Sequence, residues 1–173
     1  MTENRFTFAV DRKPEGRYAL SRVGLIGLYV LFLVVGFCVF YAVRMPQVFA
    51  VCPLLLLILV FYTWRYTQVT NEYEIEIGQI SFARIYGNRT RRNAMTLRIK
   101  DLVSAGPGKG GNGRYAHVYD FRGSVHSPDT CYLVYRNDKD EEILVLFEGT
   151  QKAFRLLQLY NPGAVSMPKD LRY

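Results

Sequence analysis

The chain has 173 residues, of which 50% are hydrophobic, and its formal net charge at pH 7 is +7. This length accommodates one small domain of about 105 residues after Arg65, in addition to the first 64 residues. The basic excess is spread along the chain, with only +3 contributed after Arg65, so we expect no nucleic-acid-binding surface. The three cysteines are scattered and form no C-x-x-C pair, which excludes a disulfide framework and is typical of a reducing compartment.

Residues 1–22 form a polar, basic arm ahead of the first long apolar segment. Phe6, Phe8 and Val10 occupy alternate positions, which is typical of a short strand or of a segment lying on a surface. The same residues also fit a solvated cytoplasmic arm that directs membrane insertion, and the arm is the favoured interpretation.

Two apolar runs follow closely, Val23 to Val43 and Gln47 to Trp64, and neither contains a charged residue. As helices they would be roughly 31 and 27 Å long, which matches a hydrocarbon layer of roughly 30 Å. The three residues between them leave room only for a tight turn. The sequence therefore predicts a two-helix transmembrane hairpin over residues 23–64.

The distribution of basic residues around the hairpin predicts its orientation. Arg44 is the one basic residue in the turn, whereas several flank the outer ends, namely Arg12, Lys13, Arg17, Arg22 and Arg65. Because such residues stay on the cytoplasmic side, we expect a multi-pass protein of the cell membrane with both termini in the cytoplasm. A cleaved signal peptide is the alternative, but the first run is too long and no small-x-small cleavage site follows.

Residues 65–165 are expected to form a mainly antiparallel β domain, followed by a tail over 166–173. Alternation predicts a hairpin with its turn at Gly78–Gln79 and Ile77 opposite Ile80, which leaves Glu72, Glu74 and Glu76 on a solvent-exposed face. Further strands are predicted over residues 94–99, 102–105, 114–121, 131–136 and 142–147, and a closing helix capped by Thr150 over residues 151–160.

Seven short strands closed by an amphipathic helix resemble the pleckstrin-homology (PH) fold. Together with Asp11 to Tyr18, Tyr62 to Tyr66, Tyr73-Glu74-Ile75 and Leu159 to Pro162, this order is similar to an uncharacterised bacterial family of two-span membrane proteins. The resemblance implies a PH-like barrel or roll with a C-terminal helix, and it brings no catalytic residue. In PH domains that bind phosphoinositides the basic residues belong to the first hairpin loop, whereas the loop predicted here, Gly78–Gln79, is uncharged.

A basic cluster lies between Arg84 and Lys100, a segment without any acidic residue. Held near the inner leaflet, it would attract anionic phospholipid headgroups or another membrane protein. The residues predicted to make this contact are Arg89, Arg91, Arg92, Arg98 and Lys100. The alternative is a solvated basic edge that discourages strand pairing.

The sequence predicts no catalytic site, cofactor or metal ion. The glycine-rich segment 106–113 matches G-x-G-x-x-G twice but precedes a predicted strand, so we interpret it as a mobile hairpin loop. His117, Asp120 and His126 are too few for a convincing metal site. We therefore expect a membrane-anchored, non-catalytic binding or assembly module. The alternatives are a structural subunit that forms homo-oligomers and, less favoured, a small membrane enzyme.

Overall fold

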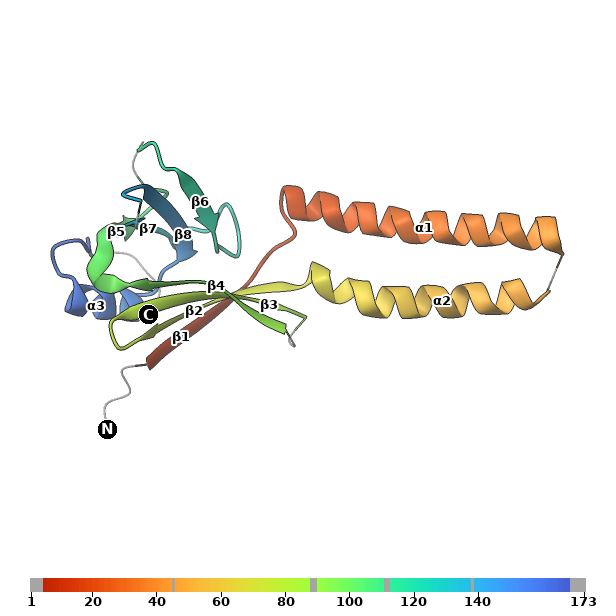
Figure 1. Ribbon diagram of the computed structural model, residues 1–173, viewed down its shortest axis with the longest axis horizontal. Helices are drawn as coiled ribbons and strands as arrows, with labels where there is room; N and C mark the ends of the chain where they lie inside the picture. Colours follow the sequence, from red (N-terminus) through yellow and green to blue (C-terminus); the bar gives the residue numbers. More distant parts are fainter. Residues whose placement is uncertain (1–4, 45, 88–89, 111–112, 138, 169–173) are drawn as a thin grey trace. The chain divides into compact units, whose positions relative to one another are not determined.

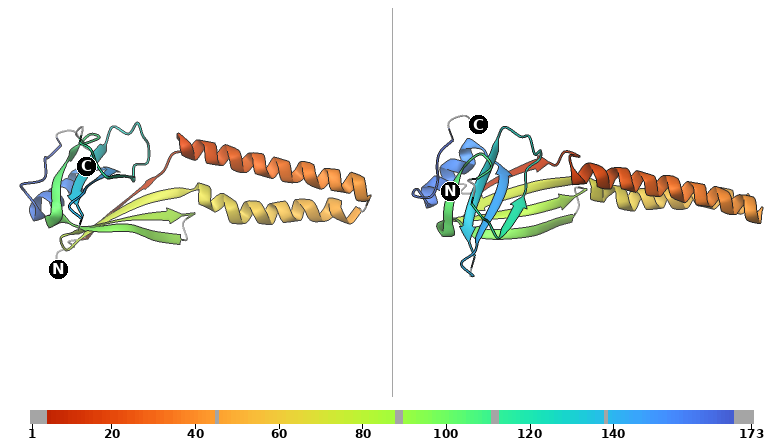
Figure 2. Two further views of the ribbon diagram at one scale, coloured as in Figure 1. Left: turned by 45° about the horizontal axis from the view of Figure 1, so that its top comes forward. Right: turned by 90° about the horizontal axis from the view of Figure 1, so that it is seen from above.

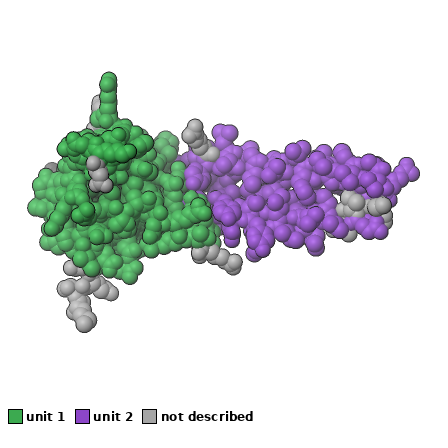
Figure 3. Space-filling view, viewed as in Figure 1, with its two compact units in different colours: residues 1–13, 70–173 green, residues 14–69 purple. Residues whose placement is uncertain are grey.

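The chain divides into two compact units. The computed structural model describes residues 5–44, 46–87, 90–110, 113–137 and 139–168. Residues 14–69 make up one unit, here called the helical unit, and residues 1–13 together with 70–173 make up the other, the β unit (Figure 3).

The helical unit consists of two antiparallel helices, α1 (Arg17–Val43) and α2 (Pro46–Trp64), followed by the short 3-10 helix η1 (Arg65–Thr67) (Figure 1). The segment Tyr18–Val43 is long and apolar enough to cross a membrane, and only 6% of its most apolar window is buried. Among the described residues, the apolar stretch Val51–Thr67 is shorter. One clear candidate span therefore stands beside a second apolar helix.

The two helices are joined along a seam of α1 residues spaced by seven. These are Arg22, Tyr29 and Gly36, which contact the carbonyl of Thr67, the hydroxyl of Thr63 and the side chain of Cys52. A spacing of seven keeps the contacts on one helix face, as in left-handed helix pairs. At Gly36 the approach is so close that an added Cβ would lie 2.2 Å from Sγ of Cys52.

Sheet A of the β unit contains four strands in the order β1 (Arg5–Asp11), β2 (Val69–Glu76), β3 (Gln79–Tyr86) and β4 (Thr90–Arg98). Strands β1 and β2 pair antiparallel, from Arg5 opposite Glu76 to Asp11 opposite Thr70. The chain thus leaves sheet A at Asp11 and returns to it at the neighbouring position, Thr70. Residues 12–68 are an insertion between two adjacent strands.

This pairing corrects the interpretation of residues 1–22 as a solvated arm. Residues 5–11 form a strand, because Phe6 and Phe8 pack against the core. Their ring centroids lie 6.3 and 5.4 Å from that of Tyr73. The segment before the helices therefore belongs to the β unit, which the predicted boundaries had placed wholly after residue 65.

The turn between β2 and β3 lies one residue earlier than predicted. It is formed by Ile77 and Gly78, with φ values of 45° and 73°, rather than by Gly78 and Gln79. The predicted and the observed registers both place Tyr73, Ile75 and the inward residues of β3 on one face. Alternation alone therefore does not distinguish the two registers. Ile77 is consequently a turn residue and is 78% exposed.

Sheet B contains β5 (Leu102–Pro107), β7 (Thr130–Arg136), β8 (Glu142–Glu148) and β6 (His117–Asp120) in the order β5-β7-β8-β6. The 3-10 helix η2 (Ile99–Asp101) connects β4 to β5. Strand β6 is shorter than the predicted 114–121 strand and runs parallel to β8. The glycine-rich segment is therefore not a hairpin loop, because it leads from β5 to the opposite edge of the sheet.

The described part of the glycine-rich segment packs on sheet B. Gly110 has a φ of 81°, and a Cβ there would lie 2.9 Å from Leu144. The positive φ favours glycine at this position, whereas the Leu144 side chain could shift to admit a Cβ. Residues 111–112, which the G-x-G-x-x-G matches include, lie outside the described residues.

Both sheets and the closing helix α3 (Gln151–Tyr160) contribute to the main core, and the ribbon views show the blue helix α3 beside the strands (Figure 2). Thr150 caps α3 as predicted, since its hydroxyl accepts a hydrogen bond of 3.3 Å from the Ala153 N–H. The ring of Phe147 on β8 lies 5.9 Å from Phe82 on β3 and 6.2 Å from Phe154 on α3. These contacts tie the two layers and the helix together.

Candidate functional site

One end of sheet A carries both the insertion and a concentration of basic residues, and it is here called the basic end. Because successive strands run in opposite directions, Asp11, Thr70, Tyr86 and Thr90 all lie at this end. Of the predicted contact residues, Arg91 and Arg92 lie at the basic end, near the start of β4.

The remaining predicted residues do not join them. Arg98 ends β4 and Lys100 lies in η2, so both are at the opposite end of sheet A. Arg89 lies outside the described residues. Arg98 forms an ion pair with Asp101 at 3.6 Å. Because both side chains are exposed, this pair adds little to the stability of the fold.

Lys100 lines an open groove of about 540 Å³ with Arg136 and Asn137. Arg136 is paired with Asp140 and Glu142, at 3.4 and 3.5 Å. The charges around this distant groove are therefore largely balanced.

Arg91 is committed to carboxylates of its own sheet. Its guanidinium donates to Glu72 at 2.8 Å and to Glu74 at 3.0 Å, and Arg5 from β1 also donates to Glu74. Glu74 is only 8% exposed, so the expectation of a solvent-exposed glutamate row is wrong at this position. The basic side chains of two other strands close over it, which the sequence of β2 alone does not indicate.

This ion cluster determines how Glu74 ionises. Burial alone would raise the pKa of the Glu74 carboxyl, but the hydrogen bonds from Arg91 and Arg5 outweigh it and lower the pKa below its ordinary value. A carboxylate with a depressed pKa is no general acid or base near neutral pH. The cluster therefore holds β1, β2 and β4 together and supplies no acid-base chemistry.

Glu74→Gln is expected to destabilise the β unit by about 1–2 kcal/mol at pH 7, because it leaves Arg91 and Arg5 with a weaker acceptor. The folded pKa lies below the unfolded pKa, which is about 4.3, so this stabilisation is complete above that pH and is lost as the pH falls through the folded value. Denaturant unfolding of wild type and variant, followed by near-UV circular dichroism from pH 7 to pH 3, checks this. A difference that stays constant down to pH 3 would contradict it.

Arg84 and Arg92 occupy directly opposite positions on β3 and β4. Arg84 donates to the carbonyl oxygen of Asp120 at 3.3 Å, and its guanidinium lies over the ring of Phe121, 5.1 Å from the centroid. Its Nε is buried and has no hydrogen-bond partner. Arg84 was absent from the predicted set, although it begins the acid-free segment that indicated the cluster.

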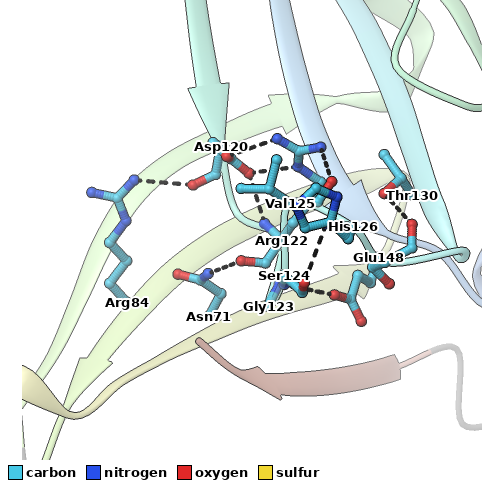
Figure 4. A network of polar contacts seen from close by, with 11 residues as sticks. Asn71, Arg84, Asp120, Arg122, Gly123, Ser124, Val125, His126, Thr130 and Glu148 are labelled. Carbon is cyan, nitrogen blue, oxygen red and sulfur yellow. Dashed lines mark hydrogen bonds and ion pairs between the residues drawn. The ribbon is translucent and has the colours of Figure 1, made fainter. Parts of the chain in front are cut away.

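A polar network fixes the loop that follows β6, residues 121–129, here called the Arg122 loop (Figure 4). The Arg122 side chain is 7% exposed and is held by the Asp120 carboxylate at 2.9 and 3.0 Å. Glu148 on β8 accepts hydrogen bonds from the backbone N–H groups of Gly123 and Ser124 at 3.0 and 3.2 Å. The loop is thereby fastened to both β6 and β8.

The Asp120 carboxylate is fully engaged in this network. Burial would raise its pKa, but the hydrogen bonds and charge of Arg122 lower it overall. Asp120 is therefore occupied as an ion-pair partner of Arg122. Across the described ranges, no three His, Cys, Asp or Glu side chains gather as possible metal ligands.

The Arg122 loop also contacts both strands that border the insertion. The Lys13 N–H donates to the Gly123 carbonyl at 2.7 Å, just beyond β1. The Asn71 side chain on β2 donates to the Arg122 carbonyl at 3.0 Å. The loop therefore links sheet B to the place where the chain enters and leaves the helical unit.

Nucleophilic chemistry has little support among the described residues. Cys131 is fully buried in the core, and burial raises the pKa of its thiol to about 12. Such a thiol is protonated at neutral pH and unreactive. What the basic end offers is one guanidinium held in place, that of the half-buried Arg84, and an exposed one on Arg92, and guanidinium groups are suited to binding an anion.

Two sheets around a single core, closed by a C-terminal helix, define a PH-like β domain. The chain belongs to the family described as "Bacterial PH-like domain (DUF6106)", whose model matches residues 5–167, and this confirms the predicted family. No curated protein and no solved structure matches the chain. The match begins at β1, so the first connection within the domain's sheet is the insertion over residues 12–68 and not the uncharged turn at Ile77–Gly78.

Proposed function

We propose that the protein is a non-catalytic binding or assembly module, held at the inner leaflet of the cell membrane by two transmembrane helices. Its basic end lies toward the lipid headgroups and contacts anionic lipids or a membrane partner. The observation that carries the proposal is the pairing of Asp11 with Thr70 across the helical insertion.

This pairing supports a second crossing independently of the apolar length of α2. If α1 spans the bilayer, the chain must return to the original side before Thr70 can pair with Asp11. Helix α2 is the long helix between them, and its 19 residues correspond to about 28 Å, close to the thickness of the hydrocarbon layer.

The distribution of charge supports the proposed orientation. Basic residues border the outer ends of the helices, and Arg44 is the one basic residue between them. Residues 12–16 and 65–68 are the connections between sheet A and the two long helices, and chains of that length reach at most about 18 Å. Basic residues held this near to anionic headgroups gain about 1 kcal/mol each.

Cysteine labelling in intact cells tests the topology. In a background lacking the three natural cysteines, Arg44→Cys is expected to react with a membrane-impermeant maleimide added from outside. Lys139→Cys, in the turn after β7, is expected to react only after the membrane is permeabilised. Labelling of Lys139→Cys in intact cells, or of Arg44→Cys only after permeabilisation, would overturn the proposed anchor.

A further inference from the structure

Two arginines are cross-strand neighbours at the basic end. Arg84 and Arg92 are directly opposite on neighbouring antiparallel strands, so their side chains share one face of sheet A. Like charges in this arrangement destabilise a sheet. Among the described residues, no carboxylate forms a hydrogen bond or ion pair with either guanidinium.

We propose that Arg84 and Arg92 together bind a phosphomonoester group, whose charge of about −1.5 to −2 at pH 7 matches the two guanidinium groups. Planar guanidinium forks donate paired hydrogen bonds to phosphate oxygens. This inference deepens the proposed function and rests on it in placing the site toward the membrane.

Arg84 is held ready for such a ligand. The Phe121 ring lies beneath its guanidinium and is itself stacked on Phe82, with ring centroids 4.9 Å apart. The hydrogen bond to the Asp120 carbonyl fixes its direction, while the buried Nε retains an unused N–H. Because this Nε is buried, a ligand oxygen would be bound by the terminal nitrogens of the half-buried side chain.

The surrounding charges favour an anion. Asp120, whose backbone oxygen accepts from Arg84, has its carboxylate already neutralised by two hydrogen bonds from Arg122. Arg91, on the other face of β4, is likewise satisfied by Glu72 and Glu74. Arg92 is exposed and so accessible to a ligand from solution or from a lipid surface.

The phosphomonoester has two possible sources, a lipid headgroup or a soluble metabolite. The first arm of the test uses the full chain in neutral phosphatidylcholine nanodiscs, titrated with glycerol 3-phosphate. Nitrogen-15 NMR of arginine side chains then reports on the guanidinium groups directly. The second arm replaces part of the neutral lipid by phosphatidic acid, a phosphomonoester, or by phosphatidylglycerol, a phosphodiester, at equal surface charge.

In at least one arm, the phosphomonoester is expected to shift the Arg84 and Arg92 signals together. Arg92→Gln should weaken binding about tenfold or more, as expected for the loss of a charge-assisted contact. Arg98→Gln is the matched control, because it removes the same charge from the same strand at its distant end, and it should leave binding unchanged. Arg84→Lys keeps the charge without the planar fork and should bind more weakly than wild type.

The two arms identify the source. Shifts with phosphatidic acid alone assign a lipid headgroup, and shifts with glycerol 3-phosphate alone assign a soluble ligand. Equal weakening by Arg98→Gln and Arg92→Gln would overturn the site, as would an equal response to acetate or the absence of shifts with both phosphomonoesters. The labelling experiment on Arg44 and Lys139 does not depend on these arginines, so failure of the site and failure of the anchor are distinguishable.

Discussion

Replacing residues 14–67 by a short turn is expected to yield a water-soluble, folded β unit. The turn would join Lys13, which follows β1, to Gln68, which precedes β2. The adjacent ends of these strands are already paired, Asp11 with Thr70. Antiparallel neighbours need only a tight connection, so the helical unit is dispensable for the β fold. A cooperative thermal transition and dispersed amide NMR signals, measured without detergent, would show that the β unit has folded.

Deletion of residues 1–13 from this soluble form is expected to abolish its folding. The deletion removes one of the two strands that flank β2, together with Phe6 and Phe8, which pack on the core, and the ion pair between Arg5 and Glu74. A Phe side chain contributes roughly 1.5–3 kcal/mol when fully buried and less when partly buried, but these losses add to the lost strand pairing, and the total stability of a domain is only about 5–15 kcal/mol. A truncated chain that melts cooperatively at the same temperature would contradict the role assigned to β1.

Gly123→Ala is expected to destabilise the β unit by about 2–3 kcal/mol, a typical cost of forcing extra volume into a packed site. A Cβ on Gly123 would lie 2.3 Å from Cγ1 of Val10 and 2.9 Å from the backbone oxygen of Asp11. Neither neighbour is the flexible end of a long side chain, so the Arg122 loop would have to move away from β1. Denaturant unfolding of the full chain in detergent, followed by near-UV circular dichroism, measures the change.

Gly163→Ala is the matched control for this substitution. An added Cβ at Gly163 meets no atom within 4 Å and the residue has no positive φ, so the change should be neutral or slightly stabilising. If the Gly123→Ala variant proved as stable as the Gly163→Ala variant, the loop would not be packed against the end of β1 as described.

The local sequence pattern predicts those elements whose partners are close in the chain. Thr150 and the apolar stripe after it predict α3 correctly, because a helix cap and a helix face involve residues three or four apart. Alternation predicts β2 and β3 for the same reason. Their turn is placed one residue late, because Ile77 adopts a positive φ that isoleucine rarely has.

Features formed by distant segments are not visible in the local pattern. Phe6 and Phe8 alternate in the same way whether they form a strand or a surface arm, and their partner β2 begins more than fifty residues later. Glu74 is buried by arginines from β1 and β4, so its own strand gives no sign of it. The basic segment 84–100 is evident in the sequence, but only the register places Arg84 opposite Arg92 and Arg98 far from both.

Because the insertion separates β1 from β2 in the chain, the order of synthesis determines when sheet A can be completed. Strand β1 leaves the ribosome first, yet it has no partner until both helices and β2 have been made. A chain in which only α1 entered the bilayer would hold β1 and β2 on opposite faces, and Tyr73 and Ile75 would remain uncovered. Such a half-inserted chain would expose apolar surface of the kind that chaperones and proteases recognise, so under the proposed topology completion of sheet A would act as a check on membrane insertion.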